Sequence, residues 1–247
     1  GTDGGTGGKV VFYADTDIVI GGNVQIYSRG GKGGNAVADD YTDVLAGGAG
    51  GLGGGVSLTA NSGTLTLPAT STIGSYGGMG GNGSNGFAGN PGIDALDPWP
   101  GDAGEGGANG GVGGYGGNGG SVLLQAKHLV INGIVESVGG VGGTGGNGGA
   151  GGTGGQGAYS AGFYDLSPGD GGDGGNGGVG GYGGDGGTVT IHGINGPGST
   201  FDITGGVIRT IILLFEIFSD DEDGSAFKEL EVVLDRALEH RAIAGHR

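Results

Sequence analysis

Runs of Gly-Gly-x triplets constrain this chain more than any other feature of its sequence. Residues 139–187 hold one such run, a short mixed segment and a second run, and glycine supplies 75 of the 247 residues. A period of three suits a left-handed polyproline-II-type helix with three residues per turn, so each triplet gives two bare glycine edges and one decorated edge. Bare edges let extended legs approach closely enough for their backbone N–H and C=O groups to bond one another. We therefore expect ordered polyglycine legs, with flexible Gly-rich linkers as the alternative.

A repeated phrase of alternating residues follows four of the glycine runs. The phrase, Gly-Gly-x-Val-x-apolar-x-Ala/Gly, stands at residues 7–14, 53–60, 119–126 and 186–193. Alternation with period two predicts strands. Their buried side would hold Val10/Phe12, Val56/Leu58, Val122/Leu124 and Val189/Ile191.

Each unit continues into further short strands. A second strand is expected at residues 18–20, 65–67, 129–131 and 201–203. A third phrase, apolar-x-Ser-x-Gly-Gly, closes three units at Ile26/Ser28, Ile73/Ser75 and Val135/Ser137. A unit of this size is too thin to bury its own apolar side, whereas stacked units bury a continuous interior, as in a solenoid.

The excursions between units predict the overall architecture. Residues 29–55, 76–120 and 138–187 each have glycine runs on both flanks and a non-glycine tip, and residues 1–8 add a partial leg. The expected fold is all-β and repetitive: a short β-solenoid of about four rungs with projecting polyglycine-II hairpin legs, followed by a C-terminal strand and amphipathic α-helix. The expected domains are residues 1–206 and residues 207–247.

The C-terminal segment differs in composition from the rest of the chain. Residues 208–218 (IRTIILLFEIF) predict one buried strand, and Ser225 can cap a helix that runs to about residue 244. This segment is either a cap on the open end of the solenoid or an element that joins subunits. The candidate assembly residues are Ile211, Leu213, Phe215, Phe218, Phe227, Leu230 and Leu234.

Charge and composition exclude several classes of partner. A formal net charge of −16 argues against nucleic acid and against an anionic membrane surface. The longest apolar run, residues 211–215, is too short to span a bilayer. The absence of cysteine excludes disulfides and thiolate metal sites. The expected partners are further copies of the chain, in an oligomer or filament, or a cell-surface glycan or protein.

No residue pattern in the chain indicates catalysis, a cofactor or a dedicated metal site. His128 and His192 are expected to point outward on strands, without partners at ligand spacing. Asp220, Asp221 and Asp223 are weak cation candidates, because their segment only partly matches a calcium-binding loop.

The positions of the aromatic residues indicate a role in contacts more clearly than those of the titratable residues do. Several lie at the hairpin tips, where they suit recognition of a ligand, contact between subunits, or packing on one another. These tip residues are Tyr41, Trp99, Tyr159, Phe163 and Tyr164. Tyr115 and Tyr182 share the phrase Gly-Gly-Val-Gly-Gly-Tyr-Gly-Gly and are expected to be stacked neighbours on the bundle surface.

Two resemblances accompany these patterns. The phrase at residues 119–140 (GGSVLLQAKHLVINGIVESVGG) resembles rungs of bacterial surface β-helices of the filamentous-haemagglutinin type. The Gly-Gly-x runs look like the polyglycine-II bundles of T-even-type phage tail-tip adhesins and of the snow flea antifreeze protein. The resemblances imply an architecture and an extracellular, cell-surface or virion-surface location, and they transfer no active site.

Three functions are compatible with these expectations. The leading hypothesis is a non-enzymatic extracellular structural protein that self-assembles into a filament or surface layer through its C-terminal segment and hairpin tips. The alternative is an adhesin whose tips contact a receptor or glycan. Ice binding is third, although the varied x residues do not form the flat, regular row of small residues that it needs.

Overall fold

The computed structural model describes residues 1–37, 45–94, 101–156, 167–194, 200–202, 207–209 and 212–214. These residues form strands and extended legs, with no helix among them. The strands are β1 (Val10–Ala14), β2 (Ile18–Val19), β3 (Gln25–Arg29), β4 (Val56–Leu67), β5 (Thr72–Tyr76), β6 (Ser121–Ile131), β7 (Ile134–Val138), β8 (Thr188–Gly193), β9 (Thr200–Asp202), β10 (Val207–Arg209) and β11 (Ile212–Leu214).

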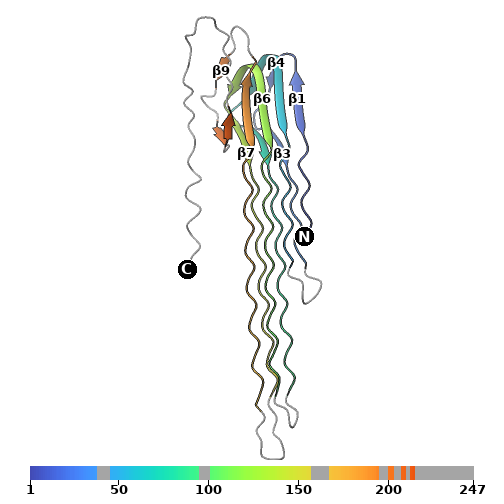
Figure 1. Ribbon diagram of the computed structural model, residues 1–247. Helices are drawn as coiled ribbons and strands as arrows, with labels where there is room; N and C mark the ends of the chain where they lie inside the picture. The colour runs from blue at the N-terminus through green and yellow to red at the C-terminus, as the bar shows by residue number, and fades with distance from the viewer. Residues whose placement is uncertain are drawn as a thin grey trace, which may run out of the picture.

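The strands form two parallel sheets at one end of the molecule (Figure 1). The larger sheet has the order β1-β4-β6-β8-β11, with β2 paired to β4 and β9 paired to β6. The smaller sheet has the order β10-β7-β5-β3. The all-strand, parallel arrangement is that of a β-solenoid-like fold, in which segments far apart in the sequence lie side by side.

The register of these sheets confirms the repeat read from the sequence. Val56 pairs with Val122, and Val122 pairs with Val189, so the first phrase stacks on itself. The second strands stack as well, with Leu65 beside Leu129. In the smaller sheet, Ser75 pairs with Ser137. One residue of slip would have moved every apolar side chain to the other face.

The core lies between the two sheets and consists of the predicted inward positions. Leu58, Leu65, Leu124 and Leu129 are completely buried. Phe12 is an exception, because it remains 46% exposed. It lies on β1, which is the end strand of its sheet, so no described strand covers its outer edge.

The expected single strand at residues 208–218 is wrong. The structure divides this segment between β10, which pairs with β7 in the smaller sheet, and β11, which pairs with β8 in the larger sheet. Only residues 210 and 211 separate the two strands. By contrast, the earlier connections from the smaller sheet to the larger sheet, such as that from β3 to β4, run through glycine legs. A mostly apolar segment without regular alternation does not reveal where the chain changes sheets. The predicted C-terminal helix lies outside the described residues.

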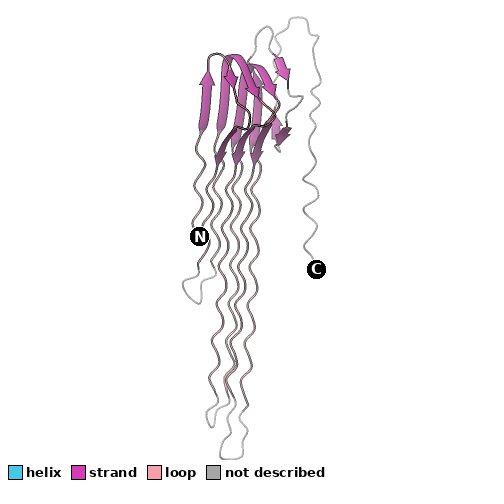
Figure 2. Ribbon diagram, turned by 180° about the vertical axis from the view of Figure 1, so that it is seen from behind, coloured by secondary structure: helices cyan, strands magenta, loops and turns pink. Residues whose placement is uncertain are grey.

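Extended glycine-rich legs project from the end of the sheets where the runs begin (Figures 1 and 2). We number the legs in chain order. Odd-numbered legs run toward the sheets and even-numbered legs run away from them. The described parts are leg 1 (residues 1–8), leg 2 (30–37), leg 3 (45–55), leg 4 (77–94), leg 5 (101–120), leg 6 (139–156) and leg 7 (167–187). Later legs are longer than the first three.

Backbone hydrogen bonds with a period of three join the legs in two layers, one of odd legs and one of even legs. Within a layer, the first glycine of a triplet donates its N–H to the x carbonyl of the next leg, as Gly80 does to Val141 at 2.9 Å. Between layers, the second glycine donates to a second-glycine carbonyl of the preceding leg. Gly143 donates in this way to Gly114, and Gly181 donates to Gly143, each at 2.8 Å. The interior of the bundle is therefore made of backbone.

Close approach between backbones explains why these positions are glycine. A Cβ added to Gly143 would lie 1.9 Å from the Gly81 carbonyl oxygen, and one added to Gly113 would lie 2.1 Å from that of Gly143. None of the glycines tested in this way has a φ between +20° and +160°. Glycine is needed here for the space it leaves, and not for an unusual backbone conformation.

Candidate functional site

The hairpin-tip residues of the sequence-based hypothesis lie outside the described residues. They are Tyr41, Trp99, Tyr159, Phe163 and Tyr164. The same holds for the cation candidates Asp220, Asp221 and Asp223, and for the assembly candidates Ile211, Phe215, Phe218, Phe227, Leu230 and Leu234. The remaining assembly candidate, Leu213, lies on β11 in register with Val189. These roles stay predictions.

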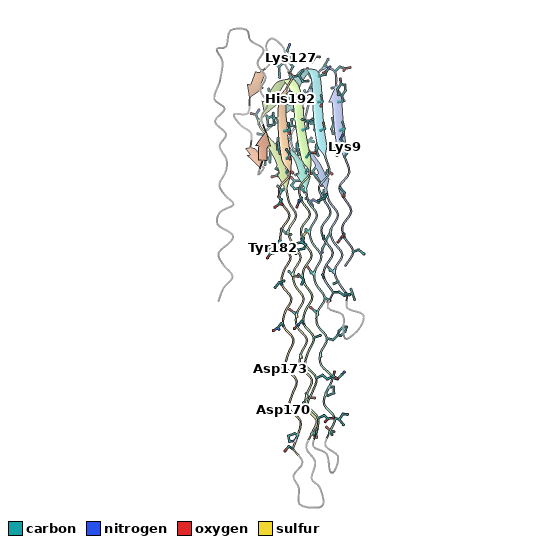
Figure 3. The ribbon with its side chains drawn as sticks, in the orientation of Figure 1. Lys9, Lys127, Asp170, Asp173, Tyr182 and His192 are labelled. Atoms are coloured by element: carbon teal, nitrogen blue, oxygen red, sulfur yellow. The ribbon has the colours of Figure 1, made fainter. Side chains whose placement is uncertain are left out.

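Within the described ranges, the chemistry of a metal site or a membrane span is not found. No group of three or more His, Cys, Asp or Glu side chains among these residues is arranged to hold a metal ion. No helix long and apolar enough to cross a membrane occurs in this part of the chain. His128 and His192 lie on β6 and β8, half-buried (Figure 3 labels His192).

A cluster on the outer face of the smaller sheet brings together aromatic and charged side chains. It comprises Tyr27 and Arg29 from β3, Tyr76 from β5 and Glu136 from β7. The rings of Tyr27 and Tyr76 meet edge to face, with centroids 6.0 Å apart. The Arg29 guanidinium lies 5.6 Å from the first ring centroid and 5.3 Å from the second. At an exposed site such as this one, each cation–π contact is worth about 0.5–1 kcal/mol.

The Tyr76 hydroxyl anchors this cluster to the next strand. It donates a hydrogen bond to Glu136 Oε1 at 2.5 Å. Burial, and secondly this bond to a carboxylate, raise the pKa of Tyr76. Gly74 makes the arrangement possible, because a Cβ there would lie 2.8 Å from the Tyr76 ring.

The cluster lines a shallow hollow whose chemistry is polar. Gln25 and Thr72 complete its lining beside the four cluster residues. The Arg29 guanidinium beside two rings, with the Glu136 carboxylate on the same face, is equipped to contact planar or polar groups of a partner.

The sequence reasoning missed this cluster, although the signal for it was available. Aligning Ser28 with Ser75 and Ser137 also places Tyr27, Gly74 and Glu136 side by side in the sheet. What the alignment could not supply is the side-chain direction of Tyr76, which bends across Gly74 toward Glu136.

The surface of the bundle carries the x residues in ordered ranks. Tyr115 of leg 5 and Tyr182 of leg 7 are stacked, with centroids 6.0 Å apart and ring planes 10° apart, as predicted. In other ranks an x side chain caps the next leg. Asn109 Oδ1 accepts the N–H of Asn176 at 2.8 Å, and Asn118 Oδ1 accepts that of Asp185 at 3.0 Å. Asn and Asp recur at x positions because their side-chain oxygen accepts a backbone N–H of the next leg in the layer. Glycine has no side chain that could do so.

Comparison with known proteins gives little guidance to the class of protein. No protein-family model matches the chain, and no curated protein matches it either. A solved structure of the springtail antifreeze protein from Granisotoma rainieri, described as a nine polyproline type II helical bundle whose crystal waters match the ice lattice, is 26% identical. The match covers 71% of this chain and 94% of that chain, with a TM-score of 0.13. At that TM-score the likeness carries no argument about fold or function.

Proposed function

We propose that this chain is a non-enzymatic, extracellular structural protein of the cell or virion surface that self-assembles into a filament or layer. Its architecture would be a β-solenoid of about four rungs with polyglycine-II hairpins. The observation that carries the proposal is the unbroken ladder of backbone hydrogen bonds between legs 4, 5, 6 and 7. Each leg is held by its neighbours at every third residue, so the legs together form a stiff rod.

The distribution of side chains supports a structural role over a chemical one. The interior of the rod is backbone, and the interior between the sheets is aliphatic. The outer-face cluster of Tyr27, Arg29, Tyr76 and Glu136 is suited to contact. Function would then reside in shape, length and association.

Electron microscopy of the negatively stained full chain, with and without calcium, tests the proposal. We expect filaments or layers of uniform width. Deletion of residues 207–247 should abolish them if the C-terminal segment joins subunits. Isolated short rods at all protein concentrations would contradict self-assembly.

A second candidate function is an adhesin that binds a receptor or glycan through the hairpin tips. It is supported by the length of legs 4 to 7, whose described ends lie far from the sheets (Figure 1). Residues 95–100 and 157–166 connect these leg ends and contain the candidate tip aromatics Trp99, Tyr159, Phe163 and Tyr164. Substituting Trp99 and Tyr164 with Ala should abolish cell or glycan binding and leave the oligomeric state unchanged. Retained binding would exclude these residues as the contact.

A further inference from the structure

The outer edge of the bundle at legs 6 and 7, here called the last-turn edge, is an incomplete part of the hydrogen-bond lattice. In inner legs, the first glycine donates its N–H to the next leg of its layer, as Gly113 of leg 5 does to Val179 of leg 7. In legs 6 and 7 the equivalent donors have no acceptor among the described residues. They are the N–H groups of Gly142, Gly145, Gly148, Gly151, Gly154, Gly171, Gly174, Gly177, Gly180 and Gly183.

Leg 7 also has more glycine than its own neighbours require. A Cβ added to Gly174 or Gly177 would lie 3.7 or 3.8 Å from the nearest atom, which is ordinary contact. The same holds at Gly171, Gly180 and Gly183, at 3.4 to 3.7 Å. Glycine loses the most conformational entropy on folding, so keeping five here destabilises the isolated molecule. In leg 6 the equivalent glycine is required by leg 7, because a Cβ on Gly142 would lie 2.0 Å from the Gly181 carbonyl oxygen, and a further backbone that approaches leg 7 as closely would require these five.

The opposite edge at legs 1 and 2, here called the first-turn edge, has the complementary groups. The x carbonyls of Asp3, Thr6, Lys32 and Asn35 correspond to those that accept bonds in inner legs, and no described residue donates to them. The N–H of Gly5 corresponds to that of a second glycine, and it too has no acceptor in the described ranges. A Cβ added to Gly5 would meet nothing within 4 Å.

The two edges also carry exposed side chains of opposite charge. Lys9 and Lys32 are exposed at the first-turn edge, whereas Asp170 and Asp173 are exposed on leg 7. Figure 3 shows Lys9 on one side of the molecule, with Asp170 and Asp173 on the other. Opposite charges on two surfaces favour their encounter and set their register.

We propose that the last-turn edge of one molecule binds the first-turn edge of a second copy of this chain. The proposal rests on the self-assembly put forward above and names its interface. The next leg of this pattern would lie beside leg 6 in its layer and would bond to leg 7 of the other layer, so it must run antiparallel to leg 7. Leg 1 of the second copy, which like leg 7 runs toward its own sheets, does so only when that copy is inverted. The two copies are then related as consecutive legs within one molecule are.

The inverted arrangement is also the one that the sheets allow. β11 already occupies the position beside β8, so an upright copy could not place its β1 there. Inversion moves the second set of sheets toward the far end of leg 7 and places leg 2 of the second copy in the layer of leg 7, where Lys32 would lie in rank with Asp170 and Asp173. Two last-turn edges related by a two-fold axis would present donors to donors. The contact is therefore between unlike edges and can continue from copy to copy.

Sedimentation velocity of the full chain over a hundredfold range of concentration tests this interface. The Gly174→Ala/Gly177→Ala variant places two Cβ atoms where the second copy would lie, without a clash inside its own fold. We expect the wild type to associate and the variant to weaken association at least tenfold. The control is Val112→Ala, which changes an exposed, outward-facing position on inner leg 5, away from the last-turn edge, and should associate like the wild type. Circular dichroism and melting temperature verify that all three are folded.

A charge exchange provides an independent arm. Asp170→Lys/Asp173→Lys and Lys32→Glu should each weaken association, and the three substitutions in one chain should restore it. If the wild type associates and the glycine variant does so equally, the interface is wrong while self-assembly stands. If the wild type remains a monomer throughout, both proposals are wrong.

Discussion

The hydroxyl oxygen of Ser75 accepts the backbone N–H of Gly120 at 2.9 Å while donating to the carbonyl oxygen of Gly54 at 2.6 Å. It thus bridges two successive points at which a leg enters the larger sheet. Ser28 and Ser137 make equivalent bonds, to Gly8 and Gly120. The predicted Ser phrase therefore marks the junction between sheets and legs.

Removing the Ser75 hydroxyl should destabilise this junction. Ser75 is completely buried, so Ser75→Ala leaves the Gly120 N–H and the Gly54 carbonyl without this partner. The expected loss is about 1–3 kcal/mol in the free energy of unfolding, measured by urea denaturation. Ser121→Ala, at an exposed position on β6, is the matched control and should change stability by less than about 0.5 kcal/mol.

Two glycine-to-alanine variants should have opposite effects on stability. Gly143→Ala places a Cβ 1.9 Å from the Gly81 carbonyl oxygen, so legs 4 and 6 must separate, and the chain should lose several ladder bonds. Gly174→Ala meets nothing closer than 3.7 Å, so reduced entropy of the unfolded chain should stabilise it by about 0.4–1 kcal/mol. Thermal melts of both variants at low protein concentration measure the difference. Equal melting temperatures would contradict the steric account of the triplets.

The bond from Tyr76 to Glu136 should make stability depend on alkaline pH. The pKa of Tyr76 is raised above its ordinary value of 10.0, so the folded state favours the protonated phenol. This contribution is fully present below pH 10 and is lost as the pH rises above that value. We expect the melting temperature to fall more steeply above about pH 10 in the wild type than in Tyr76→Phe. At neutral pH, Tyr76→Phe should lower stability by about 1 kcal/mol.

The Tyr76 result can be distinguished from general alkaline denaturation. Tyr182→Phe removes an exposed hydroxyl from the bundle and should leave the pH profile unchanged. Absorbance of tyrosinate should also report one tyrosine fewer in the late phase of the Tyr76→Phe titration. A pH profile that is the same in wild type and Tyr76→Phe would contradict the assignment.

Truncation of the core should confirm that the sheets fold as one stack. Leu124 is fully buried on β6, between Leu58 of β4 and Ile191 of β8 in the register of the sheet. Leu124→Ala should cost about 2–5 kcal/mol. Leu52→Ala, on an exposed x position of leg 3, should be nearly neutral. Urea denaturation followed by far-ultraviolet circular dichroism measures both.

The sequence was informative wherever a pattern recurs. Alternation placed Val56, Val122 and Val189 in one column, and the triplet period placed Tyr115 beside Tyr182. A repeat predicts register because each copy must bury the same side against its neighbour.

Features that depend on the ends of the repeat could not be read in this way. Phe12 has the same place in its phrase as Leu58, yet it is exposed because, among the described strands, β1 has a neighbour on one side only. Residues 208–218 are mostly apolar and show no regular period that marks the change from β10 to β11. The Tyr76 contact with Glu136 depends on a rotamer, which local sequence does not specify.

The backbone interior of the legs gives the two ends of the molecule different responses to temperature. Exposing apolar surface raises the heat capacity on unfolding, whereas exposing polar peptide groups lowers it. The aliphatic interior between the sheets follows the first rule and loses stability on cooling. The legs are held together by hydrogen bonds between peptide groups, such as those of Gly114, Gly143 and Gly181, so they follow the rule for polar groups. Cold should therefore loosen the sheets before it loosens the glycine rod.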